Sequence, residues 1–212
     1  PARAPCQARS RASLDRLLTA VELVIAERGV ADLTVQGVAR RAGLAAGTLY
    51  TRFDGKDALL RAFTVAFFAR ARRAADQLFD DARWRNMSSR ALVGATVRVV
   101  VKSYRAKRSL LRALYLYVRS HPDAEFRTEA AAFNSEFVRR LTDLLLRHRA
   151  VMRHPAPERG VLLGLLLVDA AAKETILFGD GRPSDLLVSD EELAETLTAL
   201  YCDLLGIPEA TS

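Results

Sequence analysis

The stretch Thr34–Phe53, TVQGVARRAGLAAGTLYTRF, holds two short helical patterns on either side of a tight turn. Thr34 has a hydroxyl that can cap the first helix, and Gly43 permits the chain to reverse before the second. Three apolar residues can form a small core between the two helices: Val38, Leu44 and Leu49. The pattern predicts a helix-turn-helix motif over residues 34–53, although any helical hairpin of an all-α protein shares most of these features.

The second helix of this motif has an outward face that separates it from an ordinary hairpin. Its residues are small or polar, with one phenol and one guanidinium: Ala46, Gly47, Thr48, Tyr50, Thr51 and Arg52. Such a face can enter the major groove of DNA without steric clash and without repulsion from acidic groups. The residues themselves therefore favour DNA binding.

The charge of the chain is concentrated near this motif. Residues 1–75 hold 13 Lys and Arg against 6 Asp and Glu, whereas the rest of the chain holds 19 of each. A basic segment on a neutral body is typical of a protein that meets a polyanion.

Helical spacing of apolar residues continues along the chain, and no alternating strand pattern interrupts it. The first helix is expected to be capped by Ser13 and stopped by Gly29, and a long helix is expected from Lys56. Five further helices are expected over residues 88–105, 109–119, 123–149, 157–178 and 189–205. With the two helices of the motif, these patterns predict an all-α protein of about nine helices.

Other features narrow the class of protein. The longest apolar run, residues 161–168, is far shorter than the ~20 residues that a membrane span needs. The two cysteines, Cys6 and Cys202, favour free thiols in a reducing cytosol, so we expect a cytoplasmic protein. The sequence has no metal-ligand spacing among its histidines and no phosphate-binding or nucleophile motif, so we expect no metal, no cofactor and no enzyme activity.

Residues of the N-terminal quarter resemble those of the tetracycline-repressor (TetR) family of bacterial transcription regulators. The resemblance covers about residues 11–62 and is carried by these residues with their spacing intact: Gly29, Leu33-Thr34-Val35, Val38-Ala39, Ala42-Gly43-Leu44, Gly47-Thr48-Leu49-Tyr50, Phe53, Lys56 and Leu59-Leu60. Ala45 departs from the family pattern, in which a capping Ser is usual at this position. The resemblance implies a three-helix DNA-binding domain over residues 1–55 and a larger helical domain for ligand binding and dimerisation over residues 56–212.

The resemblance also implies roles for individual residues in DNA binding. Thr34 and Lys56 would meet phosphates, and Tyr50 would place its hydroxyl on the DNA backbone. Arg52 would contact either a guanine or a phosphate. The remaining positions would lie nearest to base edges or adjacent phosphates: Ala46, Gly47, Thr48 and Thr51. Arg9 and Arg11 are expected either to reach the DNA or to form a solvated arm.

A ligand pocket is expected in the larger domain. Its candidate residues are mostly aromatic, with one amide: Trp84, Tyr104, Tyr115, Phe133, Asn134 and Phe137. The alternative for each aromatic residue is plain core packing. Asp169 and Lys173 stand four residues apart, which favours a simple ion pair within a helix over contact with an ionisable ligand.

The segment 160–168 is apolar nearly all round, which indicates a helix buried on more than one side. Packing against a second copy of the chain explains this better than a central position within one subunit. The residues expected at the dimer interface are Leu163, Leu166, Leu167, Leu197, Leu200 and Tyr201.

Together these observations favour a homodimeric, ligand-responsive regulator that binds a palindromic operator in double-stranded DNA. A repressor released by a small, largely apolar effector is favoured, although the sequence does not exclude an activator. The alternative is a helical protein that sequesters a ligand and does not bind DNA. This alternative does not explain the basic N-terminal segment or the outward face of the GTLY stretch, residues 47–50.

Overall fold

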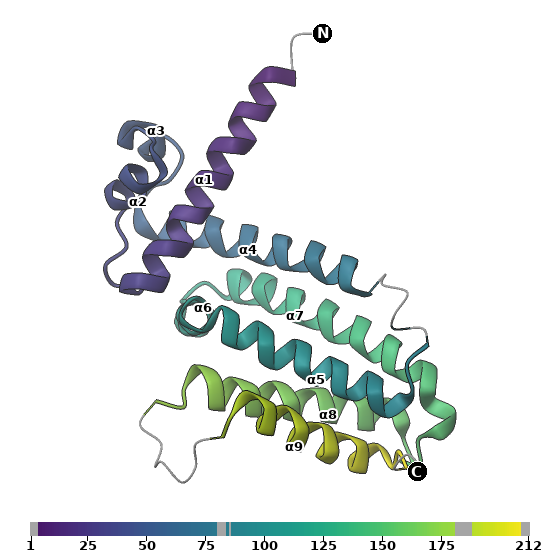
Figure 1. Ribbon diagram of the computed structural model, residues 1–212. Helices are drawn as coiled ribbons and strands as arrows, with labels where there is room; N and C mark the ends of the chain where they lie inside the picture. The colour runs from purple at the N-terminus through teal and green to yellow at the C-terminus, as the bar shows by residue number, and fades with distance from the viewer. Residues whose placement is uncertain (1–3, 80–83, 85, 181–187, 209–212) are drawn as a thin grey trace. The chain divides into compact units, whose positions relative to one another are not determined.

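The computed structural model describes residues 4–79, 84, 86–180 and 188–208 of the 212-residue chain, with the backbone alone for residues 4–12, 75–79 and 133–134. Every regular element in these ranges is helical, as predicted. The elements (Figure 1) are α1 (Ala4–Arg28), α2 (Val35–Ala42), α3 (Ala46–Tyr50), α4 (Gly55–Phe79), α5 (Ser89–Ala106), α6 (Arg108–Ser120), α7 (Ala124–Leu145), η2 (Leu146–Val151), α8 (Pro157–Ala172), η3 (Lys173–Leu177) and α9 (Asp190–Leu205).

The start of the first helix differs from the prediction. Ser13 was expected to cap it, but α1 begins at Ala4, so Ser13 lies inside the helix. The upstream residues are rich in Ala and Arg, which are strong helix formers, and Pro5 stands in the first turn of α1, where the missing N–H costs little. Residues 6–13 hold no Gly or Pro before the apolar face that begins at Leu14. Extension of the helix upstream is therefore favoured over an N-terminus capped by the Ser13 hydroxyl.

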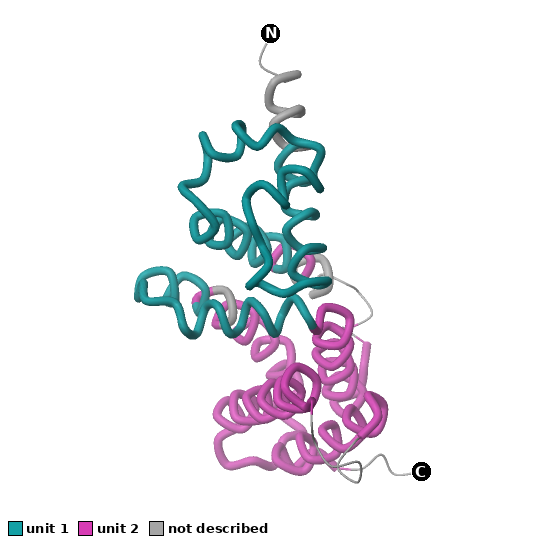
Figure 2. The backbone as a smooth tube through the Cα atoms, turned by 90° about the vertical axis from the view of Figure 1, so that its left-hand side faces the viewer, with its two compact units in different colours: residues 1–71, 109–131 teal, residues 72–108, 132–212 magenta. Residues whose placement is uncertain are grey.

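The chain forms two compact units (Figure 2). The first contains residues 1–71 and 109–131, and the second contains residues 72–108 and 132–212. We predicted a domain boundary after residue 55, and the first compact unit continues along α4 to residue 71. This extension has a packing reason, since Leu59, Leu60 and Phe63 of α4 are buried in the N-terminal core.

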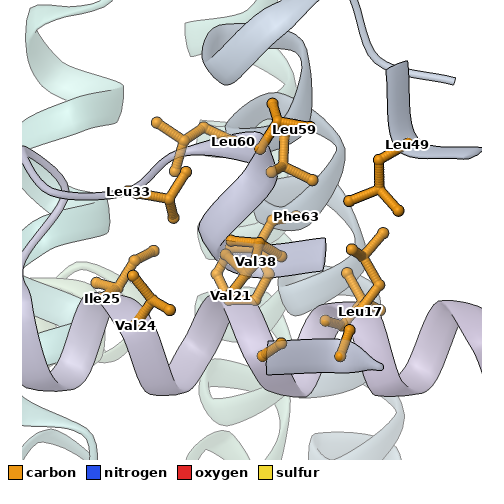
Figure 3. Packing of buried hydrophobic residues seen from close by; sticks show 14 of the residues in the cluster. Leu17, Val21, Val24, Ile25, Leu33, Val38, Leu49, Leu59, Leu60 and Phe63 are labelled. Atoms are coloured by element: carbon orange, nitrogen blue, oxygen red, sulfur yellow. The ribbon is translucent and has the colours of Figure 1, made fainter. Parts of the chain in front are cut away.

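The core of the first unit joins α1, α2, α3 and α4 (Figure 3). Figure 3 shows apolar side chains from all four helices in one cluster: Leu17, Val21, Val24 and Ile25 of α1, Val38 of α2, Leu49 of α3, and Leu59, Leu60 and Phe63 of α4, with Leu33 from the segment between α1 and α2. The predicted core of the motif is confirmed for Val38 and Leu49, while Leu44 is partly buried against the cluster. Burial of each large side chain contributes about 1.5–3 kcal/mol, so this cluster fixes the orientation of α3.

In the second unit, α8 and α9 pack closely. Tyr201 of α9 is 2% exposed, and its hydroxyl donates a hydrogen bond of 2.6 Å to the carbonyl oxygen of Val161 on α8. Gly164 makes this approach possible, because a β-carbon at that position would overlap the Tyr201 ring. Ser189 caps α9 by accepting a hydrogen bond of 3.1 Å from the amide of Glu192.

Candidate nucleic-acid interface

The start of α2 is set by a side-chain cap. Thr34 has an extended backbone, with φ −129° and ψ 149°, and its hydroxyl oxygen accepts a hydrogen bond of 3.0 Å from the amide of Gly37. A β-carbon at residue 37 would lie 2.9 Å from this oxygen, so glycine leaves room for the cap. The hydroxyl hydrogen of Thr34 is left to donate elsewhere, and the residue is exposed.

The turn between α2 and α3 depends on Gly43. Its φ of 65° lies in the left-handed region, and the amide of Leu44 donates to the carbonyl of Ala39 across the end of α2. This pair of features is the usual glycine-based termination of a helix. The reversal places α3 directly after α2, as the helix-turn-helix prediction requires.

The helix α3 is short and its outward face is open. Only Leu49 is buried in it, Ala46 is half-buried, and Gly47, Thr48 and Tyr50 are exposed, with Tyr50 at 52%. The N-cap residue Ala45 makes no side-chain hydrogen bond. The second helix of the motif was predicted to continue to Phe53, whereas α3 ends at Tyr50.

Two of the predicted contact residues are ready to bind an external partner. Tyr50 and Arg52 are exposed, and within the described part of the chain neither side chain makes a hydrogen bond or ion pair. Thr51 differs, because its hydroxyl donates 2.9 Å to the carbonyl of Thr48 and so closes the last turn of α3. The free phenol and guanidinium have the chemistry of groups that bind phosphates and base edges.

Gly47 has no internal reason to be glycine. Its φ is not positive, and a β-carbon there would meet no atom of the protein within 4 Å. Glycine inside a helix costs up to ~1 kcal/mol relative to alanine. An external surface that approaches the backbone of α3 at this point would explain the residue.

Lys56 has a structural bond that its sequence position did not reveal. Its ammonium donates 2.8 Å to the carbonyl of Ala31, in the segment between α1 and α2. The ammonium has three donors, so this bond leaves others for a phosphate. Lys56 therefore links α4 to the beginning of the motif as well as being a predicted DNA contact.

The two arginines of α2 have different environments. Both guanidinium nitrogens of Arg41 contact the Glu27 carboxylate on α1, at 2.8 and 2.5 Å. Arg40 is exposed and, within the described residues, makes no ion pair. Arg40 is thus a further cation beside the motif that could meet a phosphate, and the sequence alone did not separate it from Arg41.

A polar and aromatic cluster fixes the first turns of α4, directly after the motif. The Tyr117 hydroxyl donates 2.7 Å to the Asp57 carboxylate, and His121 lies 3.4 Å from the same carboxylate. One helical turn later, Arg61 donates 2.5 Å to Asp123 and lies over the Phe126 ring. These contacts hold α4 to the corner between α6 and α7 within the first unit.

Charge and hydrogen bonding shift the pKa values of this cluster. The backbone amide of Phe126, with the Arg61 guanidinium, holds the pKa of the Asp123 carboxyl below its usual value. Burial, together with the bond to Asp57, raises the pKa of the Tyr117 phenol. At neutral pH the Asp123 carboxyl therefore stays ionised and accepts its hydrogen bonds, and the Tyr117 phenol stays protonated and donates to Asp57.

The candidate pocket residues are distributed over both units. In the second unit, Trp84 is 3% exposed, Phe137 is half-buried, and the Tyr104 hydroxyl donates 2.6 Å to Asp169. Tyr115 belongs to the first unit and accepts a hydrogen bond of 2.7 Å from Arg119. The side chains of Phe133 and Asn134 lie outside the described residues.

Two further sequence predictions can be compared with the second unit. Lys173 and Asp169 form the expected ion pair at 2.8 Å. One side of α8 is exposed and presents four leucines: Leu162 at 46%, Leu163 at 41%, Leu166 at 61% and Leu167 at 59%. Leu200 of α9 is also exposed, at 60%, whereas Leu197 and Tyr201 are already buried by their own chain.

The described helices include none with the length and apolar character of a membrane span. Within the same residues, no group of His, Cys, Asp and Glu side chains could hold a metal ion.

Comparison with known proteins identifies the family to which the N-terminal helices are similar. Residues 17–63, which contain α2, α3 and their packing partners, match the family model described as bacterial regulatory proteins, tetR family. These residues therefore carry the N-terminal domain of that family. A search of the curated proteins gave no significant match.

Solved structures of several transcription regulators share the fold. The chain is similar to a TetR transcription regulator from Haloarcula marismortui, with a TM-score of 0.68 and 18% identity over 93% of this chain and 97% of the other. It is similar to the fatty acid degradation regulator FadR from Bacillus halodurans, with a TM-score of 0.65 and 18% identity over 92% and 95%. It is also similar to FadR from Bacillus subtilis in complex with stearoyl-CoA, with a TM-score of 0.65 and 14% identity over 92% and 100%.

Proposed function

We propose that this protein is a regulator of the TetR family: a homodimeric repressor in the bacterial cytoplasm that binds a palindromic operator and is released by a small, largely apolar effector. The observation that supports operator binding most is the open face of α3. Among the residues that the structure describes, Tyr50 and Arg52 have no side-chain partner, and Gly47 leaves the helix backbone uncovered. In a helix-turn-helix protein this face lies in the major groove.

The exposed leucines support the homodimer. Leu162, Leu163, Leu166 and Leu167 follow one side of α8, and Leu200 of α9 is exposed as well. A contiguous apolar surface is a frequent mark of a protein interface. A symmetric dimer carries two reading helices, and this geometry fits the two half-sites of a palindrome.

The effector is proposed to be largely apolar because the described interior of the second unit is dominated by aliphatic and aromatic side chains. The similar FadR structure that contains stearoyl-CoA is consistent with this class of ligand. An effector that prefers the conformation unable to bind the operator lowers operator affinity by its differential affinity for the two states.

Selection of bound duplexes from random DNA tests the proposal. We expect an inverted repeat whose half-sites are spaced by about one helical turn of DNA. The selected duplex is then used with purified protein to screen amphipathic ligands for release. Absence of binding to any duplex at low salt would contradict a DNA-binding function.

Gly47→Ala tests the approach of DNA to α3. The added methyl group has free space in the protein, so we expect thermal stability to stay equal or to rise slightly. Operator affinity is expected to fall about tenfold or more, because the methyl group stands where the helix backbone meets the groove. Melting curves and gel shifts on the same preparation measure both effects. Unchanged affinity would place Gly47 outside the contact.

Lys56→Ala tests the double role of that residue. Loss of the bond to the Ala31 carbonyl should lower thermal stability, by about 1 kcal/mol for a typical hydrogen bond. If the ammonium also meets a phosphate, affinity should fall equally for all duplexes, and the slope of log affinity against log salt should fall by about 1 per lost contact. A loss of stability with an unchanged salt slope would leave only the structural role.

A further inference from the structure

The hydroxyl of Thr96 on α5 is buried without a hydrogen-bond partner. Thr96 is 1% exposed, and its Oγ1 atom makes no hydrogen bond within the described part of the chain. Buried polar side chains are hydrogen-bonded in the large majority of cases, because an unsatisfied group loses its bonds to water and gains nothing. At this exposure solvent does not reach the hydroxyl either, so the group is unsatisfied in this conformation.

Other helical threonines in the chain show that a partner within the helix was available. The Thr64 hydroxyl, which is also buried, donates 2.8 Å to the carbonyl of Leu60 four residues earlier. Thr142 and Thr198 do the same with the carbonyls of Val138 and Ala194. Thr96 makes no such bond to Leu92, so its hydroxyl differs from those of its counterparts.

The position of Thr96 on α5 places it away from α9. Gly94 marks the side that meets α9, since a β-carbon there would lie 3.3 Å from Thr198. Two residues along a helix correspond to a rotation of about 200°, so Thr96 lies on the opposite side of α5. Its neighbours along α5, Leu92, Val93 and Val97, are fully buried and apolar. The hydroxyl is therefore buried beside apolar side chains of α5, on the side of the helix away from α9.

The surroundings restrict what the hydroxyl can bind. The buried polar side chains of the described residues are Thr64, Thr96 and His121, and the first and last of these belong to the other unit. The Nη1 atom of Arg90 on α5 is also buried, but Arg90 stands four residues before Gly94 and so lies on the side of the helix that meets α9. A carboxylate beside Thr96 would therefore lack a counter-charge on its own side of α5 and would be expensive to desolvate. A neutral carbonyl oxygen has no such cost and accepts a hydrogen bond from a hydroxyl.

We propose that Thr96 donates a hydrogen bond to the carbonyl oxygen of an acyl ester or thioester effector, whose hydrocarbon chain lies in the apolar interior of the second unit. This inference rests on the proposed function, because it identifies a contact and a chemical class for the effector. The effector-bound conformation satisfies a hydroxyl that the ligand-free conformation leaves without a partner. This difference favours the bound state.

A matched pair of probes isolates the carbonyl. Stearoyl-CoA contains the thioester carbonyl, and its thioether analogue octadecyl-CoA lacks it. Binding of each probe is measured by calorimetry on full-length wild type, Thr96→Val and the control Thr142→Val, together with release of the selected operator. Valine replaces the hydroxyl by a methyl group of similar size at both positions, but only Thr96 has a hydroxyl free to bind a ligand.

We expect wild type to bind stearoyl-CoA about tenfold more tightly than octadecyl-CoA. Thr96→Val should remove this preference by weakening stearoyl-CoA alone, and Thr142→Val should retain it. Without probe, Thr96→Val should melt at a higher temperature than wild type because it removes a buried unsatisfied hydroxyl. Thr142→Val should melt at a lower temperature because it removes a hydrogen bond that is made.

Three results would overturn the inference: no binding of stearoyl-CoA to wild type, equal affinity of wild type for the two probes, or a Thr96→Val protein that keeps the preference. Operator binding by the ligand-free protein is measured in the same series. A protein that binds no operator refutes the proposed function. A protein that binds its operator but shows any of the three results refutes the role of Thr96 alone.

Discussion

Leu166→Glu is expected to convert the protein to a monomer and to abolish tight operator binding. Leu166 is 61% exposed in the single chain, so a charged residue there costs little in folding. In the proposed dimer face, the same change would bury two carboxylates without partners. A monomer contacts one half-site only. Loss of the second, linked binding event lowers affinity by about 100-fold or more. Sedimentation measures the mass, and gel shifts measure the affinity.

Leu116→Glu is the matched control. It introduces the same change at an exposed leucine of α6, with 49% exposure, outside the α8 face. We expect this variant to stay dimeric and to bind the operator like wild type. A Leu166→Glu protein that sediments as a dimer at the same concentration would show that the subunits associate through another surface.

The helix-turn-helix could be predicted from sequence because its determinants are local. The Thr34 cap joins residues three apart, and the Gly43 turn joins neighbours along the chain. The alternation of buried and exposed residues around Leu49 follows from helical periodicity alone. The open face of α3 was therefore visible in the sequence before any tertiary contact was known.

The partners of the charged residues could not be predicted in the same way. Lys56 bonds to a carbonyl 25 residues earlier, and Arg41 pairs with Glu27, 14 residues earlier. Tyr117 meets Asp57 across 60 residues. Such pairs depend on how helices pack, and single-sequence periodicity contains no information about which helices become neighbours.

The leucine-rich segment 160–168 shows the same limit. Its composition indicated burial on more than one side, but it did not say which leucines a single chain covers. In the structure Leu165 is buried and Leu166 and Leu167 are exposed, because Gly164 and Tyr201 determine which side of α8 faces α9. Leu197 and Tyr201, predicted to meet a partner subunit, are instead covered by their own chain and support the exposed face from beneath.

Gly164→Ala is expected to destabilise the second unit strongly. The new β-carbon would overlap the Tyr201 ring, which is 2% exposed and held by its hydrogen bond to Val161. The ring cannot move aside without breaking that bond or separating α8 from α9. Overpacking of this kind costs typically 1–3 kcal/mol and occasionally more, and we expect about 3 kcal/mol here. For a chain of this length that corresponds to a fall in melting temperature of roughly 10 °C.

A double-mutant cycle with Tyr201→Leu tests the cause. If the overlap with the ring is responsible, Gly164→Ala should cost much less in the Tyr201→Leu background, and the two changes should be strongly non-additive. Tyr201→Phe separates the ring from its hydroxyl: it should lose about 1 kcal/mol for the bond to Val161 while leaving the overlap, and therefore the cost of Gly164→Ala, largely in place. Additive effects of Gly164→Ala and Tyr201→Leu would mean that the alanine destabilises α8 by another route.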